Sequence, residues 1–272
     1  MITTHANADA SHTLTIRINR YGVAFADYSP FSREVPRFEW FEITNNTSQA
    51  SALKKILESA ELASCEYRHV EVLIDSPYTL VPLSEFSEDE VEEVFHFNFN
   101  SIRDANVHYD ILPTLGAVLI YGADILIEDI LRKHFADIRL YCTSTGLIRH
   151  FMERCRTCTY CKIFAYIHDH CLELAIFKDG KLHLANRYRV ETLDDICYFT
   201  LLAFNQLQLS NDTDEIFVVT DEREEQENII GRLQQFVTNV YPINPGGEFN
   251  RHPLTRIKGL PYDQLVFMLR QY

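Results

Sequence analysis

The sequence predicts an α/β protein built from two related halves. In each half, three strand-like segments are followed by a helix-like segment and a further strand-like segment. Corresponding points keep a near-constant separation, because Leu14 and Ile163 lie 149 residues apart and Val70 and Ile216 lie 146 apart. Self-similarity on this scale favours two half-domains over an array of short repeats. The length of 272 residues agrees with this, since it suits one large domain or two of ordinary size.

The first half begins with a hairpin and a third strand. Segments 14–19 and 23–28 are apolar or alternating, and the residues NRYG between them predict a tight turn. Segment 38–43, FEWFEI, alternates aromatic and acidic residues, which predicts a strand with one buried face. Ser48 then precedes apolar residues at steps of three and four, which predicts a capped helix. The strand HVEVLI at 69–74 closes this unit.

Extra material follows this strand, and we interpret it as an inserted subdomain at about 75–115. It contains the acidic helix SEFSEDEVEEVFHFNFNS, in which Ser87 and Glu90 have the spacing of a capping box. The first half is then expected to end with a helix, a strand and a helix, at 123–135, 136–143 and 144–155.

The second half repeats the order of the first. Its expected elements are four strands at 161–167, 171–177, 182–188 and 215–220, with a helix at 193–207 before the last of them. We therefore expect half-domains at 1–155 and 156–272, the second with a C-terminal helix. The basic residues of segment 246–272 leave two alternatives: a basic face for an acidic partner, or a helix that returns to the first half.

Composition and charge exclude several function classes. The formal net charge of −14 argues against a nucleic-acid partner, which would require a basic surface to displace counterions from phosphates. No apolar run approaches the roughly 20 residues of a membrane helix, and the first residues lack the pattern of a signal peptide. We expect a cytoplasmic protein without direct membrane insertion. Its seven cysteines are then expected to be reduced thiols.

The segment RCRTCTYC at 154–161 raises the question of a metal site. Cys155, Cys158 and Cys161 are the candidate thiolate ligands for zinc or an iron–sulfur cluster. Four-cysteine zinc modules usually carry a second C-x-x-C, and bacterial ferredoxin motifs end in a cysteine followed by proline. Neither pattern occurs here, so we predict no bound metal and interpret most of the cysteines as small buried apolar residues.

Two long segments carry a resemblance to a known fold. The segment AVLIYGADILIEDILRKHFADIRLYCTSTGLIR and the later YIHDHCLELAIFKDGKLHLANRY resemble actin-like proteins of pilus assembly and cell division. They are most similar to an uncharacterised family of Bacteroides-type proteins with an actin-like ATPase fold. The resemblance extends from Leu14 to about Val240. It implies duplicated, ribonuclease H-like half-domains, each a mixed sheet in strand-strand-strand-helix-strand-helix order.

The resemblance also implies where ATP and Mg²⁺ would bind. Proteins of this fold that hydrolyse ATP use Asp-x-Gly turns in two hairpins and a Gly-Gly turn near the adenosine. Here the first hairpin has Asn19 in the region of the carboxylate and keeps Gly22, whereas the second keeps Asp169 without the glycine. At the adenosine position, Asp221 and Glu222 stand in the region of the glycines.

These departures favour a non-catalytic actin-like scaffold that binds a protein or peptide partner, with no cofactor. The partner-binding candidates are the aromatic residues of the acidic helix, Phe95, Phe97 and Phe99, because exposed aromatic patches mark interfaces. The alternative is a divergent nucleotide-binding protein or small-molecule kinase that holds ATP and Mg²⁺ near Asn19, Gly22, Asp169 and Asp221. A homodimer is a further alternative, for which the sequence selects no surface.

Overall fold

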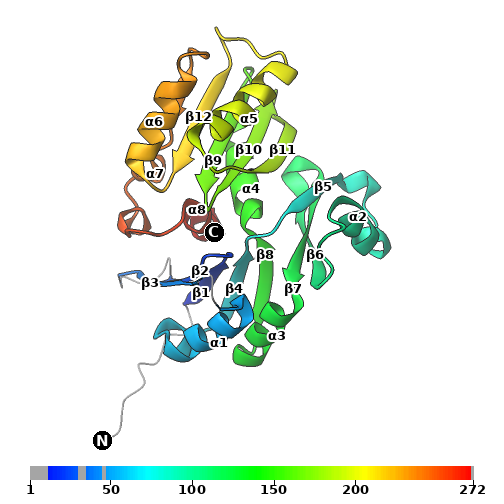
Figure 1. Cartoon of the computed structure of the whole chain (residues 1–272), viewed down its shortest axis with the longest axis vertical. Helices are drawn as coiled ribbons and strands as arrows, with labels where there is room; N and C mark the ends of the chain where they lie inside the picture. Colours follow the sequence, from blue (N-terminus) through cyan, green and yellow to red (C-terminus); the bar gives the residue numbers. More distant parts are fainter. Residues whose placement is uncertain (1–11, 30–34, 45–46, 271–272) are drawn as a thin grey trace, which may run out of the picture. The chain divides into compact units, whose positions relative to one another are not determined.

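The computed structural model describes residues 12–29, 35–44 and 47–270, which divide into two compact units (Figure 1). The first unit takes its described residues from Met1–Gly146 and Ile257–Tyr272, and the second is Leu147–Arg256. The helix α4 (Thr143–Cys155) contains the boundary between them. This boundary lies at 146/147, whereas the sequence suggested 155/156.

The first unit is centred on a five-stranded mixed sheet. Its order is β3-β2-β1-β4-β8, with bounds Thr13–Ile18 for β1, Gly22–Tyr28 for β2, Arg37–Glu42 for β3, His69–Ile74 for β4 and Ile138–Cys142 for β8. β1 pairs antiparallel with β2 and parallel with β4. Figure 1 shows α1 (Gln49–Ser59) and α3 (Ile125–His134) alongside each other against this sheet. Ser48 caps α1 as predicted, since its side chain accepts from the Ser51 N–H at 3.3 Å.

A second, three-stranded sheet forms most of the inserted segment. Its order is β5-β7-β6, with bounds Tyr78–Pro82 for β5, Ala105–Leu112 for β6 and Ala117–Asp124 for β7. The helix α2 (Val91–Asn98) packs on this sheet through Val91 and Phe95. The predicted capping box is wrong: Ser87 begins a short 3₁₀ turn, Glu88–Glu90, and makes no side-chain capping bond, because α2 itself starts three residues later than expected.

The C-terminal helix α8 (Tyr262–Arg270) belongs to the first unit. The Gln264 side-chain amide donates to the backbone oxygen of Thr15 at 2.9 Å. Arg17 Nε donates to both carboxylate oxygens of Asp263 at 2.8 Å, and both side chains are buried. These bonds attach α8 to β1. Of the two alternatives for the basic C-terminal segment, the structure thus shows the helix that returns to the first half.

The second unit repeats the topology of the first. Its sheet has the order β11-β10-β9-β12-β13, with bounds Lys162–His168 for β9, Cys171–Lys178 for β10, Lys181–Arg189 for β11, Glu215–Thr220 for β12 and Val240–Pro242 for β13. Its helices are α5 (Leu193–Gln206), α6 (Arg223–Leu233) and the short α7 (Pro245–Glu248). Since β9 pairs antiparallel with β10 and parallel with β12, as β1 does with β2 and β4, the predicted duplication is confirmed.

The apolar residues of the second unit explain why this sheet is buried on both faces. Ile163, Ala165 and Ile167 alternate along β9 and pack into a core with residues of α5 and α6. Phe164 lies on the opposite face, stacked between Phe151 of α4 and Phe217 of β12. Within residues 12–29, 35–44 and 47–270, we find no helix with the length and apolar character needed to cross a bilayer.

Candidate functional site

The turn of the first hairpin is closed by the side chain of Asn19. Its amide oxygen accepts from the backbone N–H groups of Tyr21 at 2.8 Å and Gly22 at 2.7 Å. Asn19 is 1% exposed, and its side-chain nitrogen has no hydrogen-bond partner among the described residues. The oxygen is therefore committed to the turn, while the nitrogen is a buried donor that could meet an anionic or carbonyl group.

Three parallel strands of the first unit end at the same edge of the sheet. Ile18 of β1 is in register with Ile74 of β4, which is in register with Cys142 of β8. The residues that follow these three are Asn19, Asp75 and Thr143. The Thr143 hydroxyl is buried and, like the Asn19 nitrogen, has no partner among the described residues. Ligands of open α/β sheets bind outside the carboxyl ends of strands, so this edge is the candidate site of the first unit.

Sequence reasoning found only Asn19 at this edge and missed Asp75 and Thr143. Their signal was available, since Asp75 directly follows the strand predicted at 69–74 and Thr143 is the last residue of the strand predicted at 136–143. A polar residue at that point is common in any α/β protein, however, and only the register of the strands shows which of them share an edge.

Gly22 has a packing role that requires no ligand. A Cβ atom built on it would lie 2.3 Å from Trp40 Cζ2 and 2.6 Å from the backbone oxygen of Phe41. The neighbouring strand β3 therefore occupies the space beside this glycine. A role for Gly22 in binding phosphate stays a prediction.

We expect Gly22→Ala to destabilise the first unit by about 1–3 kcal/mol, because the added methyl group must displace a backbone oxygen as well as the indole ring. Urea unfolding measures this loss. The matched control is Gly231→Ala in α6, where a Cβ atom has nothing within 4 Å. That change should leave stability unaltered or raise it by up to about 1 kcal/mol through helix propensity. Equal stability of the two variants would contradict the packing role.

The second hairpin turns at Asp169 and His170. Both residues have positive φ, 47° and 58°, as expected for the two central residues of a type I′ turn. Asp169 therefore lies at the tip of a tight turn without a glycine. Its Oδ2 is 3.1 Å from Nδ1 of the preceding residue, His168, so the carboxylate contacts its own strand.

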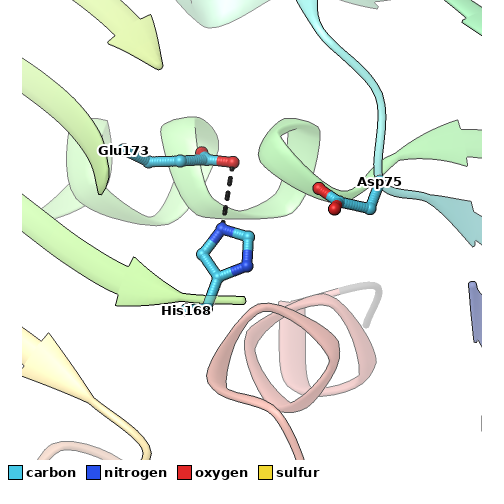
Figure 2. Close-up of side chains that lie close together, drawn as sticks. All are labelled: Asp75, His168 and Glu173. Atoms are coloured by element: carbon cyan, nitrogen blue, oxygen red, sulfur yellow. Dashed lines mark ion pairs between the residues drawn. The ribbon is translucent and has the colours of Figure 1, made fainter. Parts of the chain in front are cut away.

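His168 belongs to a polar cluster that the sequence did not reveal. Figure 2 shows one nitrogen of the buried His168 ring directed at the Glu173 carboxylate, at 3.5 Å. The same carboxylate pairs with Arg187 Nε of β11 at 3.3 Å, and Tyr166 stacks on the imidazole. The sequence signal was weak, because His168 and Glu173 share their face of β9 and β10 with apolar and aromatic residues such as Phe164 and Phe177.

Acidic residues mark the end of β12, the strand beside β9. Thr220 of β12 is in register with Ile167 of β9, so Asp221 follows the same edge as the hairpin. Asp221 and Glu222 are exposed, and α6 starts immediately after them. The pKa of Glu225 is raised, first by partial loss of its hydration and then by the Glu222 carboxylate. This end of the second unit is therefore anionic.

The structure brings together two of the three cysteines considered as metal ligands. The backbone N–H of Cys158 donates to the backbone oxygen of Cys155 at 3.1 Å. Cys161 is buried, and its backbone N–H donates to the Asp214 carboxylate at 2.8 Å. Among the described residues, the three sulfurs do not form a group close enough to hold one metal ion.

The three phenylalanines of the acidic helix have different environments. Phe95 is fully buried between α2 and the three-stranded sheet, and Phe99 packs on it with ring centroids 5.1 Å apart. Phe97 is 86% exposed. Phe95 is therefore part of the core and not of a binding surface, and the predicted contact with a partner applies to Phe97.

Solved structures show the same fold. A protein of Bacteroides thetaiotaomicron VPI-5482, described as having an actin-like ATPase fold and unknown function, is 26% identical to this chain with a TM-score of 0.81. The match covers 91% of this chain and 96% of that chain. The PilM-PilN type IV pilus biogenesis complex matches at 12% identity and a TM-score of 0.55, over 94% of this chain and 96% of that chain.

These matches confirm the predicted actin-like fold. The search among curated proteins gave no match. The family model described as "Protein of unknown function (DUF3822)" matches residues 3–240, and the chain belongs to this family.

Proposed function

We propose that this chain is a non-catalytic actin-like scaffold that binds a protein or peptide partner. The main support for the proposal comes from Asn19 at the first hairpin. Its side chain is neutral, and its amide oxygen already accepts hydrogen bonds from two backbone N–H groups. A neutral, committed oxygen is a poor ligand for Mg²⁺, which prefers carboxylate oxygens and substrate phosphates.

The charge of the second unit also opposes nucleotide binding. Asp221 and Glu222 are exposed at the end of β12, and the raised pKa of Glu225 reflects lost hydration and a carboxylate beside it. Like charges close to one another resist the approach of a further anion such as a triphosphate. The segment TDEREEQE at this position contains no glycine. It therefore lacks the glycine-rich backbone whose N–H groups could bind phosphate and offset this repulsion.

A partner is supported by the fold and by one exposed side chain. The matching PilM structure is a complex with PilN, which supports a protein-binding role for a chain of this architecture. On the chain itself, Phe97 exposes its ring on a helix whose Glu92 and Glu93 are also exposed. An exposed aromatic side chain among charges is typical of an interface anchor.

Purifying the Phe97→Asp variant from cells that naturally express the chain tests whether Phe97 binds a partner. The measurement is which proteins co-purify with the variant and with the wild type. We expect this variant to fold like the wild type, because the ring is exposed, and to lose the protein that co-purifies with the wild type. The control is Phe236→Asp, a second aromatic residue with 56% exposure, which should retain the partner. Equal recovery with both variants would remove Phe97 from the binding surface.

The second candidate function is nucleotide binding at the carboxyl edge of the first unit. It is favoured by two buried polar atoms there, the Asn19 nitrogen and the Thr143 hydroxyl. Neither has a hydrogen-bond partner in the described part of the chain, so both could contact phosphate oxygens. In the second unit, Asp169, Asp221 and Glu222 stay candidates for Mg²⁺ contacts on the sequence argument alone.

Thermal unfolding with and without Mg-ATP separates the two candidates. A ligand at 100 times its Kd stabilises the native state by about 2.7 kcal/mol, which moves the Tm of a chain of this size by several degrees. We expect no shift at millimolar Mg-ATP. A shift that is lost in Asn19→Ala and Asp169→Asn, but kept in the control Asp212→Asn at an exposed position, would instead favour the nucleotide-binding protein.

A further inference from the structure

The turn after α4 brings two cysteines close together in space. α4 ends at Cys155, and the backbone N–H of Cys158 donates to the Cys155 oxygen at 3.1 Å. A bond of this type closes a four-residue turn, whose first and last Cα atoms lie within about 7 Å. Disulfides span Cα atoms about 4.4–6.8 Å apart, so the turn matches the requirement. The Cys158 thiol donates to the backbone oxygen of Arg154, the residue before Cys155, at 3.4 Å.

Cys158 is the more accessible of the two cysteines. It is half-buried, so small molecules can reach it, whereas Cys155 is buried. An accessible thiol is the one that a disulfide reagent meets first.

Cys155 is suited to the second step. Its thiol is 1% exposed, and burial, followed by its neighbour Cys158, raises its pKa to about 12. It also lies at the C-terminal end of a helix, where the helix dipole disfavours negative charge. Cys155 therefore stays protonated and protected from solution, one tight turn away from the more accessible Cys158.

We propose that Cys155 and Cys158 form a reversible disulfide by exchange with a small-molecule disulfide such as oxidised glutathione. The Cys158 thiolate attacks one sulfur of the reagent, the S–S bond breaks, and one thiolate leaves. Cys155 then loses its proton to solvent and attacks the Cys158 sulfur, which expels the second thiolate. Two protein thiols are oxidised and one disulfide is reduced to two thiols, so atoms and electrons balance.

Mass spectrometry of the full chain tests this exchange. The protein is equilibrated with defined ratios of reduced and oxidised glutathione, quenched with acid, alkylated and digested. We expect a disulfide to form first in the peptide that contains Cys155 and Cys158. Its mass should fall by two hydrogen atoms, and neither cysteine should be alkylated. Substoichiometric iodoacetamide should modify Cys158 of the reduced protein before Cys155.

Variants separate the two steps. Cys155→Ser should stop at a glutathione adduct on Cys158, whereas Cys158→Ser should leave Cys155 unmodified. The control Cys65→Ser, at another half-buried cysteine, should change none of these results.

The proposal is overturned if Cys155 and Cys158 stay reduced under conditions in which Cys65 or Cys171 takes up glutathione. It is also overturned if Cys155 is alkylated before Cys158. Because the first measurement needs only the wild-type chain, a variant that fails to fold does not leave the question open.

Discussion

Asp263→Ala is expected to destabilise the first unit by about 3–5 kcal/mol, because it removes a carboxylate that pairs with the buried guanidinium of Arg17. Arg17 is 1% exposed, and its Nε donates to both oxygens of Asp263 at 2.8 Å. The carboxylate also accepts from the Gln264 N–H, so the substitution removes a capping bond of α8 as well.

Urea unfolding gives the size of this loss, and hydrogen exchange locates it. Protection should fall in peptides of β1 and α8. The control Asp212→Ala removes an exposed carboxylate and should change stability by less than about 0.5 kcal/mol. The double variant Arg17→Met with Asp263→Leu should recover most of the stability, since replacing both members of a buried pair by apolar residues is often neutral. A loss below 1 kcal/mol for Asp263→Ala would show that water reaches Arg17 in solution.

Phe164→Ala is expected to cost the second unit a similar amount, about 3–5 kcal/mol, by leaving a cavity in its aromatic layer. The ring of Phe164 is fully buried, stacks on Phe151 with centroids 4.3 Å apart and contacts Phe217 at 5.4 Å. The Arg154 guanidinium lies over the same ring at 5.3 Å and would lose this contact.

The measurement is again chemical unfolding, here with near-ultraviolet circular dichroism as a probe of aromatic packing. Phe236→Ala serves as the control, because that ring is more than half exposed and its loss should change stability by less than about 0.5 kcal/mol. If both variants unfold at the same urea concentration as the wild type, the stacked layer does not stabilise the unit as its geometry indicates.

The strand and helix order could be predicted from the sequence because its signals are local. Alternation along 161–167 and the spacing of apolar residues after Ser48 depend on neighbours within a few positions. The placement of α8 could not be predicted in this way. Arg17 and Asp263 are 246 positions apart, and no local pattern shows that a charged residue in an otherwise apolar strand has a partner so distant.

The aromatic residues of the acidic segment show a prediction that helical spacing corrects. Phe95, Phe97 and Phe99 were expected to form one patch on the predicted helix. On a helix, however, positions four apart share a face and positions two apart do not. Phe95 and Phe99 therefore pack together, and Phe97 points away from them. The candidate site was predicted in part: Asn19 and Asp169 lie at hairpin turns, but His168 and Glu173 needed the strand register.

The division of the chain has a consequence for its synthesis on the ribosome. The second unit is continuous, 147–256, and its whole sheet can assemble once that stretch has emerged. The first unit is interrupted, because α8 is translated only after the complete second unit. During that interval β1 lacks the helix that covers one of its faces, and Arg17 lacks Asp263. The half of the protein that is translated first is therefore the half that finishes folding last.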